Sequence, residues 1–111
     1  MPGYAVSLVA SLLLACSTVA AATVEFSVAR LGAHVFAVVR NDPPGFAVES
    51  NSGYIECRDQ LVIVDTQSNE ATTRRTLDAI RKHSNKPGRY VINTHWHDDH
   101  IVGNRLYREA F

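Results

Sequence analysis

Residues 94–100 read Thr-His-Trp-His-Asp-Asp-His, and this run constrains the fold more than any other stretch because it gathers good metal ligands in one short segment. It directly follows residues 89–93, a short β-branched and aromatic stretch, and precedes Gly103 and Asn104, which are typical of the start of a helix. The sequence therefore predicts metal ligands at the carboxyl end of a strand, where chemistry collects in α/β sheets. This position argues against the alternative, adventitious metal binding on a solvent loop.

The spacing within the run predicts two metal positions. Side chains of an extended segment alternate sides, so His95 and His97 point the same way while Trp96 points elsewhere. We expect these two histidines to hold one ion. After a turn, Asp99 and His100 are expected to hold a second ion, since carboxylate oxygen and imidazole nitrogen both suit zinc.

Two other aspartates lie close to these ligands or to the end of another strand. Asp98 could also bind a metal ion, but it lies between ligand positions, and we interpret it as a carboxylate that orients a histidine or as a solvated side chain. Asp65 follows the apolar residues 61–64, where it is expected to cap the next turn through the amides of residues 66–68.

The pattern His-x-His-x-Asp-His resembles the metal motif of the metallo-β-lactamase-fold hydrolases; the matching residues are His95, His97, Asp99 and His100. The flanking pairs at 93–94 and 103–104 also look like that family. The segment Leu-Val-Ile-Val-Asp-Thr at 61–66 resembles its hydrophobic strand ending in an aspartate, here Asp65, which supports the site through a bond to a metal histidine. The resemblance covers roughly residues 24 to 111. It implies an α+β fold, the amino-terminal half of a four-layer αββα sandwich.

The order of elements expected from the sequence suits this fold. Apolar strands are predicted near residues 24–29, 34–40, 53–57, 61–65 and 89–93. A helix capped by Ser68 or Asn69 is predicted to end before Pro87, and a closing helix begins at Asn104. The closing helix spaces its apolar residues by four, and we expect this face to be poorly covered; it comprises Leu106, Tyr107, Ala110 and Phe111.

Length and the amino terminus define the expected domains. The family sandwich needs about twice the 111 residues of this chain, so residues 23–111 are expected to be a partial domain, truncated at its carboxyl end, whose remaining metal ligands lie beyond it. Residues 1–22 resemble a secretory signal, since an apolar stretch ends in an A-x-A site before Thr23. Two alternatives are an uncleaved membrane anchor and a lipoprotein signal that acylates Cys16. All three predict an exported protein, periplasmic or secreted, that meets a membrane only through such an anchor.

The charge composition argues against nucleic acid as a binding partner. Eleven basic and eleven acidic residues balance, and no run of Lys or Arg is long enough to follow a phosphate backbone, so we expect a small-molecule substrate and no nucleic acid. Cys57, the cysteine that remains after residue 22, is expected to be a core or half-buried residue. His34 and His83 lie at the start of a strand and the end of a helix, and neither is expected to bind metal.

The resemblance implies the reaction. It implies a zinc-dependent hydrolase with two ions, in which a metal-bound hydroxide attacks an ester, amide (lactam) or related bond. Asp99 would ligate metal and orient the attacking water or shuttle its proton, a role that the resemblance alone supplies. One alternative is a sulfur dioxygenase-like oxidoreductase with a single iron; another is a truncated, non-catalytic metal-binding product. The flavin-linked diiron branch is disfavoured because His97 stands where that branch has a glutamate.

Overall fold

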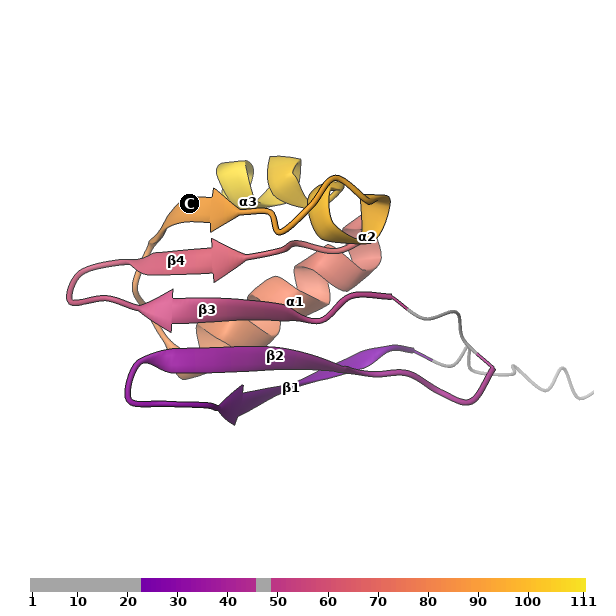
Figure 1. Cartoon of the computed structure of the whole chain (residues 1–111), viewed down its shortest axis with the longest axis horizontal. Helices are drawn as coiled ribbons and strands as arrows, with labels where there is room; N and C mark the ends of the chain where they lie inside the picture. Colours follow the sequence, from indigo (N-terminus) through magenta and orange to yellow (C-terminus); the bar gives the residue numbers. More distant parts are fainter. Residues whose placement is uncertain (1–22, 46–48) are drawn as a thin grey trace, which may run out of the picture.

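The computed structural model describes residues 23–45 and 49–111. Their secondary structure elements, in chain order, are β1 (Glu25–Arg30), β2 (Val35–Asn41), β3 (Ser52–Glu56), β4 (Leu61–Val64), α1 (Glu70–His83), β5 (Gly88–Ile92), α2 (Asp98–Ile101) and α3 (Asn104–Ala110) (Figure 1). Each predicted strand lies within one residue of its expected bounds. The short helix α2 was not predicted.

The strands form one sheet in the order β1-β2-β3-β4-β5. The first four strands are antiparallel to their neighbours, and β4 and β5 are parallel. A parallel pair needs a crossover connection, which α1 supplies between β4 and β5. As a result the carboxyl ends of β4 and β5 lie at the same end of the sheet, to the right in Figure 1.

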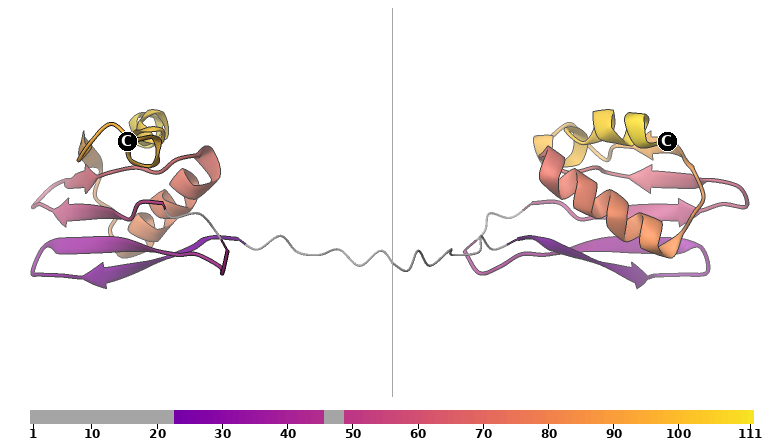
Figure 2. Two further views of the ribbon diagram at one scale, coloured as in Figure 1. Left: turned by 45° about the vertical axis from the view of Figure 1, so that its right-hand side comes forward. Right: turned by 180° about the vertical axis from the view of Figure 1, so that it is seen from behind.

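The helices α1 and α3 lie on one face of the sheet, as the view from behind shows (Figure 2). The start of α1 is set by Asn69, whose side chain accepts a hydrogen bond from the Thr72 amide at 3.0 Å. Glu70 occupies the first turn, and the last turn is basic, which complements the helix dipole. The predicted cap and the predicted end of this helix before Pro87 are confirmed.

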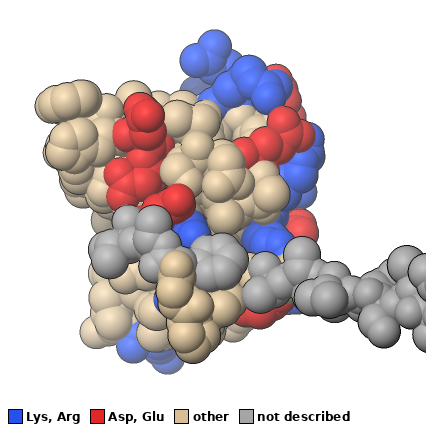
Figure 3. Space-filling model, turned by 90° about the vertical axis from the view of Figure 1, so that its right-hand side faces the viewer, with Lys and Arg blue, Asp and Glu red and all other residues tan. Residues whose placement is uncertain are grey.

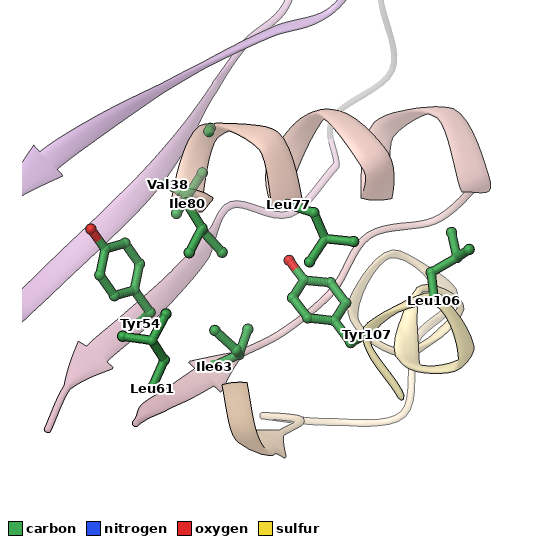
Figure 4. Packing of buried hydrophobic residues seen from close by; sticks show 9 residues of the cluster. Val38, Tyr54, Leu61, Ile63, Leu77, Ile80, Leu106 and Tyr107 are labelled. Atoms are coloured by element: carbon green, nitrogen blue, oxygen red, sulfur yellow. The ribbon is translucent and has the colours of Figure 1, made fainter. Parts of the chain in front are cut away.

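The hydrophobic core lies between this face and the helices. Leu61 and Ile63 alternate with less buried residues along β4, so both point toward α1. They pack with side chains of β2, β3, α1 and α3; the buried cluster is Val38, Tyr54, Leu61, Ile63, Leu77, Ala79, Ile80, Leu106 and Tyr107 (Figure 4). The core therefore holds β4 beneath the helices, and β5 is attached to β4 through their parallel pairing.

One expectation about α3 was wrong. Leu106 and Tyr107 are 5% and 1% exposed, because the Leu77 side of α1 and the sheet supply the partner surface that the sequence did not reveal. Only the end of that face stays open, where Phe111 is 40% exposed. Its ring lies 5.5 Å from the guanidinium carbon of Arg81, a cation–π distance.

The remaining predictions about the chain concern its cysteine and its amino terminus. Cys57 is a free, half-buried residue, as expected. Residues 1–22, and with them the predicted signal segment and Cys16, lie outside the described residues. Within 23–45 and 49–111, none of the helices has the length and apolar character needed to cross a membrane.

Candidate metal centre

The predicted ligand run leaves the carboxyl end of β5 and meets the loop that follows β4. The Asp65 amide donates to the Ile92 carbonyl at 2.9 Å, and the Thr66 amide donates to the His100 carbonyl at 3.0 Å. The backbone of the β4 loop is therefore bonded both to the end of β5 and to α2. The two segments, whose bonded residues are 27 and 34 positions apart in sequence, form one end of the sheet (Figure 1).

The loop after β4 has an unusual backbone. Asp65 has φ 58° and Gln67 has φ 135°, although neither is glycine. Aspartate tolerates the left-handed region, but the conformation of Gln67 is strained by roughly 1–3 kcal/mol. Such strain persists only where surrounding contacts hold it, and it is common at functional sites.

Asp65 is almost fully buried and is bonded through both carboxylate oxygens. Oδ1 accepts the Thr94 amide at 2.8 Å, and Oδ2 accepts the Thr94 hydroxyl at 2.8 Å. Oδ2 also lies 2.8 Å from Nδ1 of His100. The structure thus brings Asp65 against the histidine side of the predicted site and places it where a carboxylate orients an imidazole.

These contacts also set the charge of Asp65. Burial alone would raise the pKa of its carboxyl group. The hydrogen bonds from the Thr94 amide, the His100 ring and the Thr94 hydroxyl outweigh burial and hold the pKa below its ordinary value. Asp65 is therefore a carboxylate at neutral pH and accepts, rather than donates, these bonds.

His100 and Asp99 approach each other on the outer side of this pair. Because Nδ1 of His100 faces Asp65, its Nε2 points away, and Nε2 lies 3.4 Å from Oδ2 of Asp99. An imidazole nitrogen and a carboxylate oxygen therefore face each other, as expected for two residues that share one ion. Both side chains are partly covered, 16% and 27% exposed.

His95 and His97 are also brought together. Nε2 of His95 lies 3.0 Å from Nδ1 of His97, and their rings meet edge to face at 4.7 Å between centroids. The ring of His95 lies 3.9 Å from that of His100, so the three imidazoles form one cluster. At 3.0 Å, one of the two nitrogens of His95 and His97 donates a hydrogen bond to the other, and a metal ion bound between them would displace that proton.

The four predicted ligands are neighbours, yet they are not assembled around a single point. Within residues 23–45 and 49–111, no group of three or more His, Cys, Asp or Glu side chains is arranged to hold one ion. The donor set of three imidazoles and one carboxylate fits zinc chemically, with two ligands for each of two ions. A catalytic zinc usually takes three protein ligands.

The surface around the cluster is mixed in charge. α2 carries Asp98 and Asp99 in its first turn, and Asp98 is exposed. Figure 3 views this end of the molecule: acidic side chains gather at its upper left, and basic side chains lie at its upper and right margins. The acidic patch favours a bound cation.

The two other histidines of the described residues lie away from the cluster. His34 lies at the opposite end of the sheet, before β2, and the His83 ring contacts the Ala79 carbonyl of its own helix.

Several residues that hold the site in place were missed from the sequence. The Ser50 hydroxyl donates to the Asp99 carbonyl. The fully buried Gln67 donates from Nε2 to the Ser50 carbonyl at 3.2 Å and to the Ser52 hydroxyl at 3.0 Å. Ser50 and Asp99 are 49 residues apart in sequence, so no local pattern connects them.

Comparison with known proteins shows the family and the fold of the chain. The family model described as the metallo-beta-lactamase superfamily matches residues 45–111, and the chain belongs to this superfamily. The fold resembles that of a metallo-beta-lactamase from Pontibacter korlensis, with 22% identity and a TM-score of 0.66 over 78% of this chain and 40% of that one. It also resembles the DIM-1 metallo-beta-lactamase, with 20% identity and a TM-score of 0.55 over 79% of this chain and 40% of that one.

At these identities the two structures establish the fold alone: the chain is α+β and corresponds to the amino-terminal part of the metallo-beta-lactamase fold, as predicted. A curated relative, the linear primary-alkylsulfatase of a Pseudomonas species, is 40% identical over 53 residues. The match covers 48% of this chain and 10% of that protein. The chain thus spans less than half the length of each of these relatives.

Proposed function

We propose that this chain supplies four ligands of a two-zinc centre of a hydrolase: His95 and His97 for one ion, Asp99 and His100 for the other. The observation that carries the proposal is the line of contacts from Asp65 through His100 to Asp99. A carboxylate on Nδ1 fixes the proton of the imidazole there and leaves Nε2 free as a lone-pair donor. This arrangement is expected of a histidine that binds a metal ion through Nε2.

The chain's own residues divide the work. Asp65 holds the His100 ring in place through Nδ1, and the partly buried Asp99 presents a carboxylate beside it. Zinc, when bound, acts as a Lewis acid and supplies a nucleophile from water near neutral pH. Asp99 would orient that water or take its proton, because it lies at the edge of the cluster.

The names of the relatives support a proposal for the substrate class. One is named an alkylsulfatase and the others are named β-lactamases, which favours a hydrolase over a dioxygenase-like oxidoreductase. We propose a small molecule with an ester, amide (lactam) or sulfate ester bond as substrate. Because the chain spans a fraction of each relative, hydrolysis is proposed for the protein in which all the ligands of both ions are present.

Metal binding by the 111-residue chain is the direct test. Trp96, the only tryptophan in the sequence, lies with its ring 4.5 Å from that of His97, so its fluorescence reports on the cluster. Titration with Zn²⁺, followed by calorimetry and by Trp96 emission, is expected to show saturable binding. His97→Ala is expected to weaken binding by about tenfold or more, since it removes one of two ligands from an ion.

His34→Ala is the matched control, because His34 is an exposed histidine at the far end of the sheet. It is expected to bind zinc as the unmodified chain does. Equal losses in the two variants, or no saturable binding by the unmodified chain, would overturn the proposed metal centre. Hydrolysis of a linear alkyl sulfate and of a cephalosporin, assayed with the same samples, measures how much activity these ligands support.

We also propose that the protein is exported through residues 1–22, on the strength of their apolar composition and the Ala-Ala-Ala before Thr23. Expression of the chain in a bacterium, followed by mass spectrometry of its amino terminus, tests this. A terminus at Thr23 indicates a cleaved signal, an acylated Cys16 a lipoprotein, and an intact Met1 in the membrane an anchor. An intact Met1 in the cytoplasm would refute export.

A further inference from the structure

The backbone carbonyl of His100 is held by an unusual number of donors. It accepts the Thr66 amide at 3.0 Å, the Thr66 hydroxyl at 3.1 Å and Nδ2 of Asn93 at 2.6 Å. A carbonyl oxygen has two lone pairs, and most backbone carbonyls in regular structure accept one bond. The peptide that follows a predicted metal ligand is thus held from two directions, by the β4 loop and by the residue after β5.

Asn93 is itself locked by Asn104. Nδ2 of Asn104 donates to Oδ1 of Asn93 at 2.7 Å, and Nδ2 of Asn93 reaches Oδ1 of Asn104 at 3.2 Å. The Thr66 hydroxyl lies 3.1 Å from the same Oδ1 of Asn104. Asn93, Asn104 and Thr66 therefore form a closed ring of polar contacts around the His100 carbonyl, which we call the carbonyl clamp.

The carbonyl clamp is also held against the loop after β4 by the close approach of Gly103. The Gly103 amide donates to the Gln67 carbonyl at 3.0 Å. A Cβ on Gly103 would lie 2.6 Å from the Thr73 hydroxyl oxygen and 2.8 Å from the Thr66 Cβ, so only glycine permits this approach. Thr66 and Thr73 are both fully buried. Gly103, which follows α2, consequently packs closely against Thr66, the side chain that bonds the His100 carbonyl.

We propose that Thr66, Asn93 and Asn104 are positioning residues for the metal centre. Asp65 holds the ring of His100, and the carbonyl clamp holds its peptide, so the direction of Nε2 is fixed from both ends of the residue. Ser50 holds the preceding carbonyl of Asp99 in the same way. The clamp and the Ser50 bond together fix the orientation of His100 and Asp99, and loss of this preorganisation lowers metal affinity.

This inference rests on the proposed metal centre, and the test separates the two. Thr66→Val keeps the shape of the side chain and removes its hydroxyl, whereas Thr66→Ser keeps the hydroxyl. Thr76→Val is the matched control: Thr76 is a fully buried threonine whose hydroxyl donates at 2.9 Å to a carbonyl of its own helix, Thr72. Asn104→Ala opens the clamp at a less buried position and is a second variant in case Thr66→Val does not fold.

The measurement uses Co²⁺ with the 111-residue chain, because the visible absorption of cobalt reports the geometry of its ligands. Thr66→Val and Asn104→Ala are each expected to weaken Co²⁺ binding by about tenfold and to change the spectrum, while Thr66→Ser restores both. Thr76→Val is expected to lower stability against urea in EDTA as Thr66→Val does, but to leave Co²⁺ affinity and spectrum unchanged.

The outcomes are distinct. If the unmodified chain does not bind Co²⁺ or Zn²⁺, the proposed metal centre itself fails. If it binds, and both clamp variants match Thr76→Val in affinity and spectrum, the clamp is a structural feature only and the positioning role is refuted. A weaker affinity in the clamp variants, restored by Thr66→Ser, supports it.

Discussion

The apolar core beneath α1 and the polar end of the sheet after β4 and β5 are neighbours that are held together by different interactions. In the core, side chains such as Ile63 and Ile80 are fully buried and gain stability from apolar burial, which has no preferred direction. At the polar end, Asp65, Thr66 and Gln67 are just as buried but are held by specific hydrogen bonds.

The difference shows what each region is suited to do. A core of aliphatic side chains tolerates small adjustments, while a hydrogen-bonded network loses energy steeply when a partner moves. The polar end also contains the two positive φ angles of Asp65 and Gln67, which cost free energy that the core must offset. The molecule thus combines a stable core with a rigid, strained edge, where the candidate ligands lie.

The largest expected effect is a loss of stability in a core variant whose metal affinity does not change. Ile80→Ala removes a fully buried side chain near the carboxyl end of α1, and we expect it to lower the free energy of unfolding by about 2–5 kcal/mol. Urea denaturation in EDTA measures this loss. Metal affinity, titrated where the variant is folded, should stay unchanged; a parallel loss of affinity would show that the two regions are coupled.

The next effect acts on the polar end. Asp65→Asn keeps a side chain that tolerates φ 58°, so the backbone is not strained further. It replaces one accepting oxygen by an amide that faces donors of Thr94 and His100, and we expect a loss of about 1–3 kcal/mol in unfolding free energy. Metal affinity is expected to fall by about 10–100-fold, because the His100 ring loses its partner.

The pH dependence of this variant follows from the lowered pKa of Asp65. A carboxyl group whose pKa is lower in the folded state contributes its stability above its unfolded pKa and loses it as the pH falls through the folded value. In EDTA, the stability difference between the chain and Asp65→Asn should therefore be full at pH 6 and shrink below about pH 4. A difference that grows in acid would contradict the assigned hydrogen bonds.

The same two regions explain what could be predicted from sequence. The strands were predicted to within one residue because apolar alternation is a local property of the chain. The helix α2 was missed because four residues are too few to show a helical period. The covered face of α3 was misjudged because its partner, Leu77, belongs to a helix almost thirty residues earlier.

The candidate ligands could be proposed from the sequence, whereas several of the residues that hold them in place could not. The ligand run from His95 to His100 lies in one segment, and its spacing indicates metal chemistry directly. The residues that hold it come from elsewhere: Ser50 precedes β3, and Gln67 follows β4. Their hydrogen bonds depend on the register of the sheet, which no single-segment pattern specifies.

The smallest expected effect concerns Tyr107, which places a polar group in the apolar core. Its side chain is 1% exposed, burial raises the pKa of its hydroxyl far above the ordinary value, and the hydroxyl has no hydrogen-bond partner among the described residues. Tyr107→Phe removes this uncompensated group and keeps the ring, so we expect unfolding free energy to stay equal or rise by about 1 kcal/mol.

Urea denaturation of Tyr107→Phe beside Thr66→Val measures the contrast most sharply, since each variant removes one buried hydroxyl. Removal of the hydrogen-bonded hydroxyl of Thr66 should lower both stability and metal affinity. Removal of the unbonded hydroxyl of Tyr107 should lower neither. A loss of more than about 1 kcal/mol in Tyr107→Phe would mean that its hydroxyl does have a partner. The apolar core would then contain a specific polar contact of its own, and the distinction between the two regions would be one of degree.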